Sequence, residues 1–340
     1  MKILSLFSGC GGLDLGFKKA GFDICWANEF DKKICPTHEF NFPETKLDSR
    51  SIVHIPSSDM PSDIDGVIGG PPCQAFSEAG KGLGVKDARG QLFFEYLRVI
   101  RDIRPKFFMA ENVSGMLHSK HKATVDLIYT SFKELGYHVN FKLYNANDFG
   151  VPQDRKRVIF VGYRDDIYDG FFSLDSKQIT PNPILKDAIW DLKDTPMPAL
   201  EKNYTNGDLL TVPNHEYFIG SYSTMYMSRN RVRSWDEPSF TIQAGGRHAP
   251  IHPQAPKMPL VSKDNRIFVP GKEHLYRRLS VRECARVQTF PDDYIFKYKN
   301  LADGYKMIGN AVPVNFAKSI AEQIKSDLTC STTYSIKAAS

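Results

Sequence analysis

Two side chains in the first third of the chain have the types and spacing for covalent chemistry on a planar ring. Cys73 follows a segment rich in glycine and proline, Gly69 to Pro72, after an expected strand. Glu111 follows the next expected strand, and neighbouring parallel strands end at the same edge of a sheet. A thiolate is a strong nucleophile and a carboxylic acid can protonate a ring nitrogen. The pair predicts attack on an electron-poor heterocycle, although Cys73 alone could be an inert thiol and Glu111 alone a helix cap.

The segments around these side chains alternate between expected strands and expected helices. Short apolar runs predict strands at residues 2–7, 23–27, 66–69, 106–110, 138–143 and 158–162. Helical patterns lie between them at 13–20, 31–40, 92–103 and 123–135. This alternation predicts an α/β fold with a doubly wound, mainly parallel sheet. Frequent prolines from 171 to 275 predict a second, smaller and irregular domain, and helical patterns return at 280–287 and 315–328.

A glycine-rich turn follows the first expected strand, at the place where doubly wound folds bind cofactors. It reads Phe7-Ser8-Gly9-Cys10-Gly11-Gly12 and matches neither G-x-G-x-x-G nor a phosphate-binding loop. Glu29, at the end of the second expected strand, could accept hydrogen bonds from ribose hydroxyls. Turn and carboxylate together indicate a nucleoside-bearing cofactor, but a tight structural turn explains the glycines equally well.

The composition excludes several classes of protein. With 41% apolar and 24% charged residues among 340, the chain is neither disordered nor fibrous. No apolar stretch approaches the ~20 residues of a membrane span, and the first residues lack the pattern of a signal peptide. We therefore expect a cytoplasmic protein with no membrane partner. The six cysteines show no zinc-site spacing, so we expect free thiols and no metal.

Six motifs occur in an order that resembles one enzyme family. They read Phe7-Ser8-Gly9-x-Gly11-Gly12, Pro71-Pro72-Cys73-Gln74, Glu111-Asn112-Val113, Gln153-x-Arg155-x-Arg157, Arg282-Glu283-Cys284-Ala285-Arg286 and Gly309-Asn310-Ala311-Val312-Pro313. From residue 1 to about 328, the chain resembles the C5-cytosine DNA methyltransferases of the bacterial restriction–modification type. The resemblance implies a catalytic and cofactor-binding domain at 1–175, a target-recognition domain at 176–275 and a return to the catalytic domain at 276–328. Residues 329–340 are small and polar, and we expect a frayed tail there.

The resemblance also implies a cofactor, S-adenosylmethionine, and the residues that would hold it. These are Phe7, Gly9, Cys10, Gly12, Glu29, Phe30, Asp48, Pro72, Leu92 and Asn310. Glu29 would bind the ribose hydroxyls, Phe30 would stack on the adenine, and Leu92 would line the adenine pocket. The family usually has Gly-Asp-Ile after its third sheet element, whereas this chain reads KLDSRSI over residues 46–52. Either Asp48 or Ser51 would therefore meet the adenine amino group.

For catalysis, the resemblance implies covalent addition to cytosine. Cys73 would add to C6, Glu111 would donate a proton toward N3, and Arg155 would steady Glu111 and contact the base. The base that removes the C5 proton is not identifiable from the sequence. Cytosine C5 and C6 are unreachable inside a stacked duplex, so the base must be flipped out. The glycine-rich, basic segment 77–90 would close over the DNA.

The distribution of charge indicates where double-stranded DNA binds. Residues 1–170 carry 22 basic and 22 acidic side chains, so the net charge of +5 arises beyond them. Within 221–290 there are 12 basic and 5 acidic side chains, which suits a polyanion-binding face. Arginine commonly reads guanine, so the candidates for base contacts are Arg229, Arg231 and Arg247, with Arg233 expected on phosphate. The region is similar to that of HaeIII-type enzymes, which modify GGCC, but His248-Ala249-Pro250 departs from that form and leaves another GG-containing site open.

Several alternatives stay open beside this interpretation. A nicotinamide dehydrogenase would share the sheet but would leave Cys73 and Glu111 without a role. A transfer-RNA cytosine-5 methyltransferase of the related fold would keep the cysteine motif, and a catalytically dead DNA-binding module would not need it. For the methyltransferase we expect a monomer that is paired in function with a restriction endonuclease.

Overall fold

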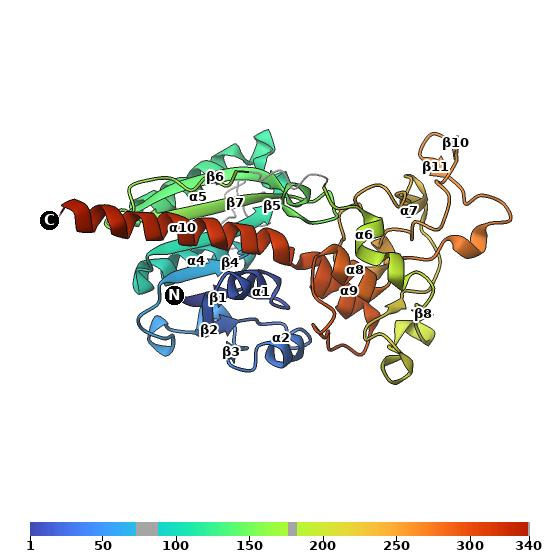
Figure 1. The fold of residues 1–340 in the computed structure, drawn as a ribbon, viewed down its shortest axis with the longest axis horizontal. Coiled ribbons are helices and arrows are strands. Elements are labelled where there is room, and N and C mark those ends of the chain that lie inside the picture. The colour runs from blue at the N-terminus through green and yellow to red at the C-terminus, as the bar shows by residue number, and fades with distance from the viewer. Residues whose placement is uncertain (73–87, 176–181, 339–340) are drawn as a thin grey trace.

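A sheet-based lobe and a smaller lobe of short elements make up the molecule (Figure 1). The computed structural model describes residues 1–72, 88–175 and 182–338. Both chain ends belong to the sheet-based lobe, and the last helix runs along it (Figure 1). The chain thus leaves this lobe, builds the smaller one and returns.

The larger lobe is built on a seven-stranded sheet in the order β3-β2-β1-β4-β5-β7-β6. Every neighbouring pair is parallel except those that β7 makes, with β5 on one side and β6 on the other. This arrangement confirms the expected doubly wound, mainly parallel α/β fold. The strands are β1 (Lys2–Leu6), β2 (Asp23–Asn28), β3 (Lys46–Asp48), β4 (Gly66–Gly69), β5 (Phe107–Val113), β6 (Tyr137–Asn145) and β7 (Lys156–Arg164).

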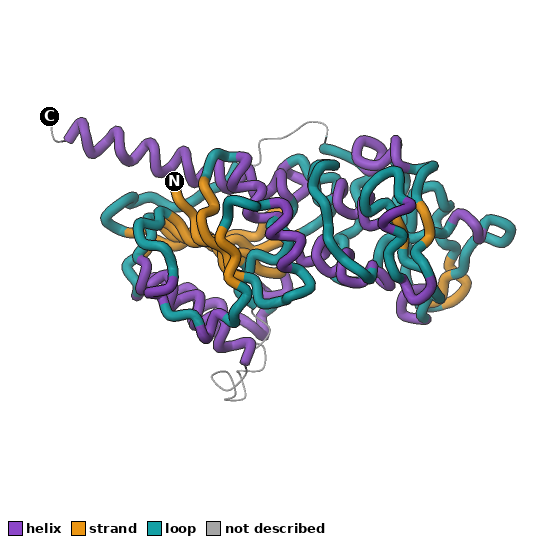
Figure 2. The backbone as a smooth tube through the Cα atoms, turned by 90° about the horizontal axis from the view of Figure 1, so that it is seen from below, coloured by secondary structure: helices purple, strands orange, loops and turns teal. Residues whose placement is uncertain are grey.

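Helices cover both faces of the sheet (Figures 1 and 2). On one face, apolar residues of α1 (Gly12–Lys19) and α10 (Val314–Ala338) pack with alternate strand residues in one core. On the other face, α4 (Ala88–Ile103) and α5 (Lys122–Glu134) form a second core with the remaining strand residues. Because strand side chains alternate between faces, both faces of the buried strands are apolar.

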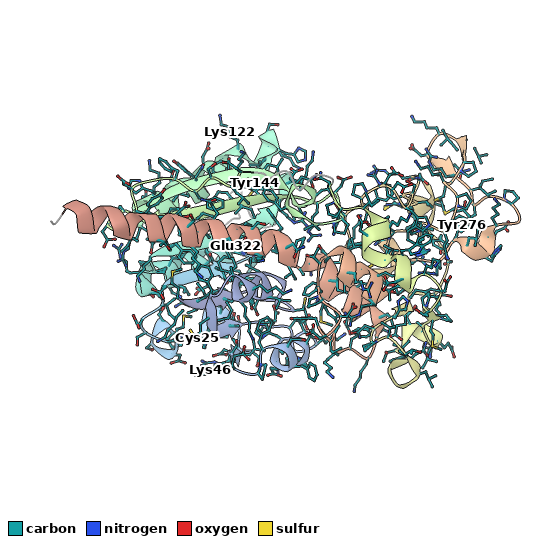
Figure 3. The ribbon with its side chains drawn as sticks, viewed as in Figure 1. Cys25, Lys46, Lys122, Tyr144, Tyr276 and Glu322 are labelled. Atoms are coloured by element: carbon teal, nitrogen blue, oxygen red, sulfur yellow. The ribbon has the colours of Figure 1, made fainter. Side chains whose placement is uncertain are left out.

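Two local features illustrate how the outer elements are built. Tyr144 of β6 lies beneath α10 and packs on Phe316, with ring centroids 6.3 Å apart (Figure 3). The helix α2 (Cys35–Asn41) begins four residues later than its apolar pattern predicted, with Pro36 in its first turn. Proline is favoured there because its missing N–H would be unpaired in any case.

The smaller lobe contains short elements separated by loops, as the prolines predicted. Its elements before residue 270 are α6 (Leu185–Ile189), β8 (Met197–Pro198), β9 (Glu216–Tyr217), α7 (Thr224–Met227), β10 (Leu260–Ser262) and β11 (Asn265–Arg266). A small aromatic cluster around Tyr276 stabilises its outer end (Figure 3).

The returning segment serves both lobes. Helices α8 (Val281–Val287) and α9 (Leu301–Asn310) share a core with α6 and with Cys10, Ile34 and Phe42 of the N-terminal part. Of the described helices after residue 276, only α10 packs on the sheet. One continuous apolar cluster therefore joins the lobes, and the expected return at 276–328 is divided between them.

The C-terminal part contains two helical stretches that the sequence pattern did not predict. The helix α9 was not predicted, because its two glycines weaken the helical pattern. The tail at 329–340 was expected to fray, but α10 continues to Ala338. Lys and Ser positions here do not interrupt the helix, so composition alone was a poor guide.

Candidate active site

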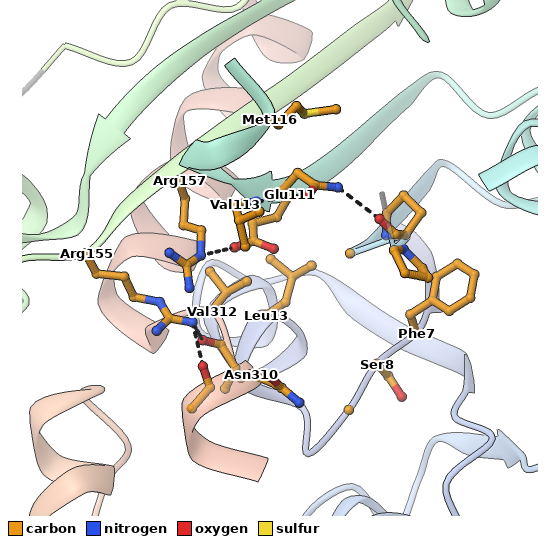
Figure 4. A pocket seen from close by; sticks show the side chains of 18 of the residues that line it. Phe7, Ser8, Leu13, Glu111, Val113, Met116, Arg155, Arg157, Asn310 and Val312 are labelled. Atoms are coloured by element: carbon orange, nitrogen blue, oxygen red, sulfur yellow. Dashed lines mark hydrogen bonds and ion pairs between the residues drawn. The ribbon is translucent and has the colours of Figure 1, made fainter. Parts of the chain in front are cut away.

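The carboxyl ends of four strands face one cavity. Residues at or just beyond the ends of β1, β2, β4 and β5 line it, and the segment from Gly309 to Val312 closes another side. Its volume is about 690 Å³, which lies within the usual range of small-molecule sites. Figure 4 shows this cavity with Phe7 and Ser8 at one end and Glu111 with Arg157 at the other.

The glycine-rich turn and Glu29 form the first end of the cavity. The Gly9 N–H donates to Glu29 Oε2 at 2.9 Å, and the Asp31 N–H donates to Glu29 Oε1 at 2.7 Å. Each carboxylate oxygen keeps further capacity to accept a hydrogen bond. A side chain at Gly9, where φ is +56°, would meet no atom within 4 Å, so the backbone is open to a ligand. Burial raises the pKa of the Glu29 carboxyl above its ordinary value.

The other expected cofactor residues divide into two groups. Phe7, Gly9, Cys10, Gly12, Glu29, Pro72 and Asn310 all line the cavity. By contrast, Phe30 is 66% exposed, Leu92 packs against the core beneath α4, and neither is part of the lining. Asp48 also lies outside the lining, and Arg50 binds both of its carboxylate oxygens.

Glu111 and Arg157 form an ion pair at the opposite end of the cavity. Arg157 Nε lies 2.7 Å from Glu111 Oε1, and both side chains are almost fully enclosed (Figure 4). Strands β5 and β7 are antiparallel, and Glu111 lies opposite Ile159, so Arg157 is its diagonal neighbour. The expected partner of Glu111 was Arg155. The register of the two strands gives that contact to Arg157 instead.

Arg155 is buried and binds backbone. Its guanidinium donates to the carbonyl oxygens of Ile242, Gly309 and Ala311 at 2.9 to 3.1 Å. Burial and the neighbouring Arg157 lower the pKa of Arg155. Because it lines the cavity and holds the backbone on both sides of Asn310, we assign Arg155 a positioning role toward that residue.

The two residues before Arg155 also bind the part of the smaller lobe that contains Ile242. The Gln153 side-chain carbonyl accepts the Ile242 N–H at 2.9 Å, and its amide donates to Gln288 at 3.0 Å. Asp154 accepts from the Arg233 guanidinium at 3.0 Å. Three consecutive residues just before β7 of the larger lobe therefore bind residues 233–242 of the smaller lobe. The motif spacing marked Gln153 and Arg155, but nothing in the sequence indicated Asp154.

The segment that leads to Cys73 is fixed by the motif that contains Glu111. The Asn112 side-chain amide donates to the Pro71 carbonyl at 2.9 Å (Figure 4). Pro71 and Pro72 line the cavity beside Glu111. Cys73 lies outside the described residues, as does most of the segment 77–90, of which residues 88–90 begin α4.

The four arginines that were expected to bind DNA differ in the contacts that they make within the protein. Arg229 and Arg247 are exposed and make no side-chain hydrogen bond or ion pair with a described residue. Arg231 donates to the Tyr226 carbonyl at 3.0 Å and lies over that ring. Arg233 pairs with Asp154 and Glu237, each at 3.0 Å, so its expected place on a phosphate conflicts with the contacts that it makes.

Much of the positive charge in 221–290 is also used internally. Arg277 binds both oxygens of the buried Glu283 at 2.7 and 2.8 Å. Arg278 and Arg282 are buried and donate to backbone carbonyls, and Arg286 pairs with Asp191 and Asp292. The excess of 12 basic over 5 acidic residues therefore overstates the charge available to a polyanion.

The residues that line the cavity fit a nucleoside cofactor. The open backbone at Gly9 and the carboxylate of Glu29 suit a ribose, and Asn310 lies at the same cavity. Across residues 1–72, 88–175 and 182–338, no group of three His, Cys, Asp or Glu side chains could hold a metal ion. Within the same ranges, no helix combines the length and the apolar character of a membrane span.

Comparison with known proteins identifies the family. The model of the C-5 cytosine-specific DNA methylase family matches residues 1–326, so the chain belongs to that family. It is therefore an enzyme, a DNA cytosine-5-methyltransferase.

Individual relatives are similar over nearly their whole length. The type II methyltransferase M.FnuDI of Fusobacterium nucleatum is 55% identical over 336 residues, which cover 97% of this chain and 95% of the relative. The type II methyltransferase M.NgoPII of Neisseria gonorrhoeae is 53% identical over 334 residues, 96% of each chain. A solved structure, of a candidate DNA modification methyltransferase encoded within an Escherichia coli prophage, is 24% identical with a TM-score of 0.73 over 97% of this chain and 99% of that one. At that identity the match supports the fold alone.

Proposed function

We propose that this enzyme transfers a methyl group from S-adenosylmethionine to C5 of a cytosine flipped out of a short duplex site. The observation that carries the proposal is the single cavity with Glu29 at one end and the Glu111–Arg157 pair at the other. A cofactor held at the first end would direct its reactive group toward a base held at the second. Cofactor and base would then share one enclosed space.

At the cofactor end, the chain supplies hydrogen bonds and shape. S-adenosylmethionine provides the methyl group as an electrophilic sulfonium. Glu29 is ionised when it accepts the ribose hydroxyls, and its two backbone N–H partners fix the carboxylate orientation. Asn310 approaches from the end of α9, where Arg155 binds the carbonyls of both neighbouring residues. Residues from both halves of the sequence, Glu29 and Asn310, would thus hold the cofactor.

At the base end, covalent addition activates the ring. The Cys73 thiolate forms a bond to C6, and the electron pair of the C5–C6 double bond moves toward the ring nitrogen N3. Glu111 donates a proton to N3 as this charge develops. Arg157 keeps the carboxyl group oriented toward the cavity. After C5 has gained the methyl group, a base takes the C5 proton, the Cys73 thiolate departs from C6, and N3 returns its proton to Glu111, which restores the aromatic ring.

The biological context that we propose is protection of DNA from a cognate restriction endonuclease. Relatives at 53–55% identity are named type II methyltransferases. For the target we propose GGCC or another GG-containing site, because Arg229 and Arg247 are exposed and free to bind guanine edges.

The test is methyl incorporation from labelled S-adenosylmethionine into plasmid DNA and into transfer RNA, followed by bisulfite sequencing of the plasmid. We expect incorporation into duplex DNA only, at one cytosine of a short repeated site. Glu111→Gln serves as the matched inactive control, because it keeps the size of the side chain and removes the acid. Incorporation into transfer RNA alone, or into adenine, would contradict the proposal.

A further inference from the structure

The turn that follows Glu111 places three basic side chains at the cavity. His118, Lys120 and His121 line the cavity that Glu111 and Arg157 also line. His118 joins two short 3-10 helices, Ser114–Leu117 and Ser119–His121, between β5 and α5, and Lys120 and His121 lie on the second of them. None of the motifs discussed above includes them.

This turn is held firmly at its base. Met116 is buried in the core beneath α5, and Figure 4 shows it next to the strand end that carries Glu111 and Val113. Backbone hydrogen bonds from His118 to Gly115 and from His121 to His118 close the two 3-10 turns at 3.2 and 2.8 Å. The basic side chains therefore project from a fixed backbone into the cavity that Glu111 also lines.

The three side chains have no polar partner in the part of the chain that the structure describes. His118, Lys120 and His121 make no ion pair and no side-chain hydrogen bond with any described residue. Lys120 and His118 are exposed, and His121 is half-buried. Among the arginines of the smaller lobe, by contrast, Arg233, Arg277 and Arg286 are neutralised by carboxylates. Unneutralised cations at the mouth of an enclosed site favour a polyanion there.

We propose that His118, Lys120 and His121 bind the backbone phosphates on either side of the flipped cytosine. When a nucleotide turns about its backbone into a pocket, its base enters while its phosphates remain at the mouth. Lys120 supplies a full charge, and each imidazole can donate an N–H whether neutral or protonated. The three side chains stabilise the extruded nucleotide through its backbone, independently of base identity. This inference rests on the proposed base flipping and extends it to residues outside the recognition region.

The test compares Lys120→Gln with Lys122→Gln in DNA binding across a series of salt concentrations. Lys122 is exposed two residues further on, at the start of α5, and does not line the cavity (Figure 3). We expect Lys120→Gln to bind the cognate duplex about 3- to 10-fold more weakly and to reduce its salt slope by about one unit. Lys122→Gln should bind DNA as wild type does. Both variants should bind S-adenosylmethionine with wild-type affinity. An unchanged salt slope in Lys120→Gln would overturn the proposal.

A neutral phosphate analogue locates the contact. Duplexes carry a methylphosphonate at one of the two phosphates that flank the target cytosine, or at a phosphate one helical turn away as the control. We expect a flanking substitution to weaken DNA binding by the wild-type protein about 3- to 10-fold. Binding by the triple variant His118→Gln, Lys120→Gln, His121→Gln should weaken by less than about twofold. Equal losses in both proteins would show that these side chains contact DNA elsewhere and would contradict the assignment. Because binding is read without methyl transfer, failure of the proposed chemistry would appear separately, as bound DNA that is not methylated.

Discussion

Arg157 Nε lies 2.7 Å from Glu111 Oε1 across the β5–β7 pair, and both side chains line the cavity. Arg155, only two residues earlier, turns its guanidinium to three backbone carbonyls instead. The two arginines of one motif thus have different tasks. Arg157 pairs with Glu111, whereas Arg155 joins Ile242 of the smaller lobe to the end of α9.

Removal of the acid should slow chemistry without weakening DNA binding. We expect Glu111→Gln to reduce the rate of methyl transfer by roughly 10²–10⁴-fold, because a positioned proton donor contributes that much. Single-turnover kinetics with saturating enzyme measures this step, and a duplex-binding assay provides the control. A chemical step at the wild-type rate would remove Glu111 from the mechanism.

The two arginines should be separable by experiment. We expect Arg157→Gln to reduce kcat while the melting temperature stays close to wild type, because this side chain contacts the acid from the edge of the cavity. We expect Arg155→Gln to lower the free energy of unfolding by about 2–5 kcal/mol, because buried carbonyls lose their donors. Thermal unfolding and single-turnover rates of both variants provide the comparison. The opposite pattern would reverse the assignment.

The recognition arginines should also behave differently from one another. Arg229→Ala and Arg247→Ala should each cost ~1–3 kcal/mol on the cognate duplex and relax specificity at one position. Arg233→Ala should leave the salt slope unchanged, because Asp154 and Glu237 already neutralise this side chain. Affinities for cognate and scrambled duplexes over a salt series distinguish these outcomes. A slope reduced by about one unit in Arg233→Ala would show that its ion pairs open on DNA and would restore its phosphate role.

Cofactor affinity should depend on pH through Glu29. Burial raises the pKa of this carboxyl above 4.5, so it gains a proton at a higher pH than an exposed glutamate does. Since the ribose hydroxyls need an ionised acceptor, affinity for S-adenosylmethionine should fall as the pH is lowered through the Glu29 pKa. Calorimetric titrations between about pH 4.5 and 8 measure this change. Glu29→Gln should bind weakly at every pH, and Glu39→Gln, on the exposed face of α2, should follow wild type.

The sequence predicted six of the seven strands of the sheet and the edge at which the site forms, but not β3 (Lys46–Asp48). Alternating apolar runs and turn residues are local signals, so the ends of β1, β2, β4 and β5 could be located closely. The partner of Glu111 could not, because it depends on the register between β5 and β7. Arg155 and Arg157 are two residues apart and share the same alternation, so only the long-range pairing distinguishes them.

The helix α9 and the distribution of charge were also beyond local reasoning. Glycine is required at position 309 of α9, because a Cβ atom there would lie 2.3 Å from the Gln243 backbone. This close approach joins segments that are distant in the sequence. Composition gave the number of arginines in 221–290 but not their burial. Arg278 and Arg282 are interior residues that satisfy carbonyls, and a count of charges treats them as surface.

Covalent attack by Cys73 is the central claim, and a mechanism-based trap tests it most directly. A duplex with 5-fluorocytosine at the target should form a complex with wild type that withstands denaturing electrophoresis in the presence of S-adenosylmethionine, because fluorine cannot leave as the proton does. Cys73→Ala should form no such complex while still binding DNA and cofactor, and Cys25→Ser, at a half-buried thiol on β2, should form it as wild type does. A stable complex with Cys73→Ala, or none with an active wild-type enzyme, would contradict the account.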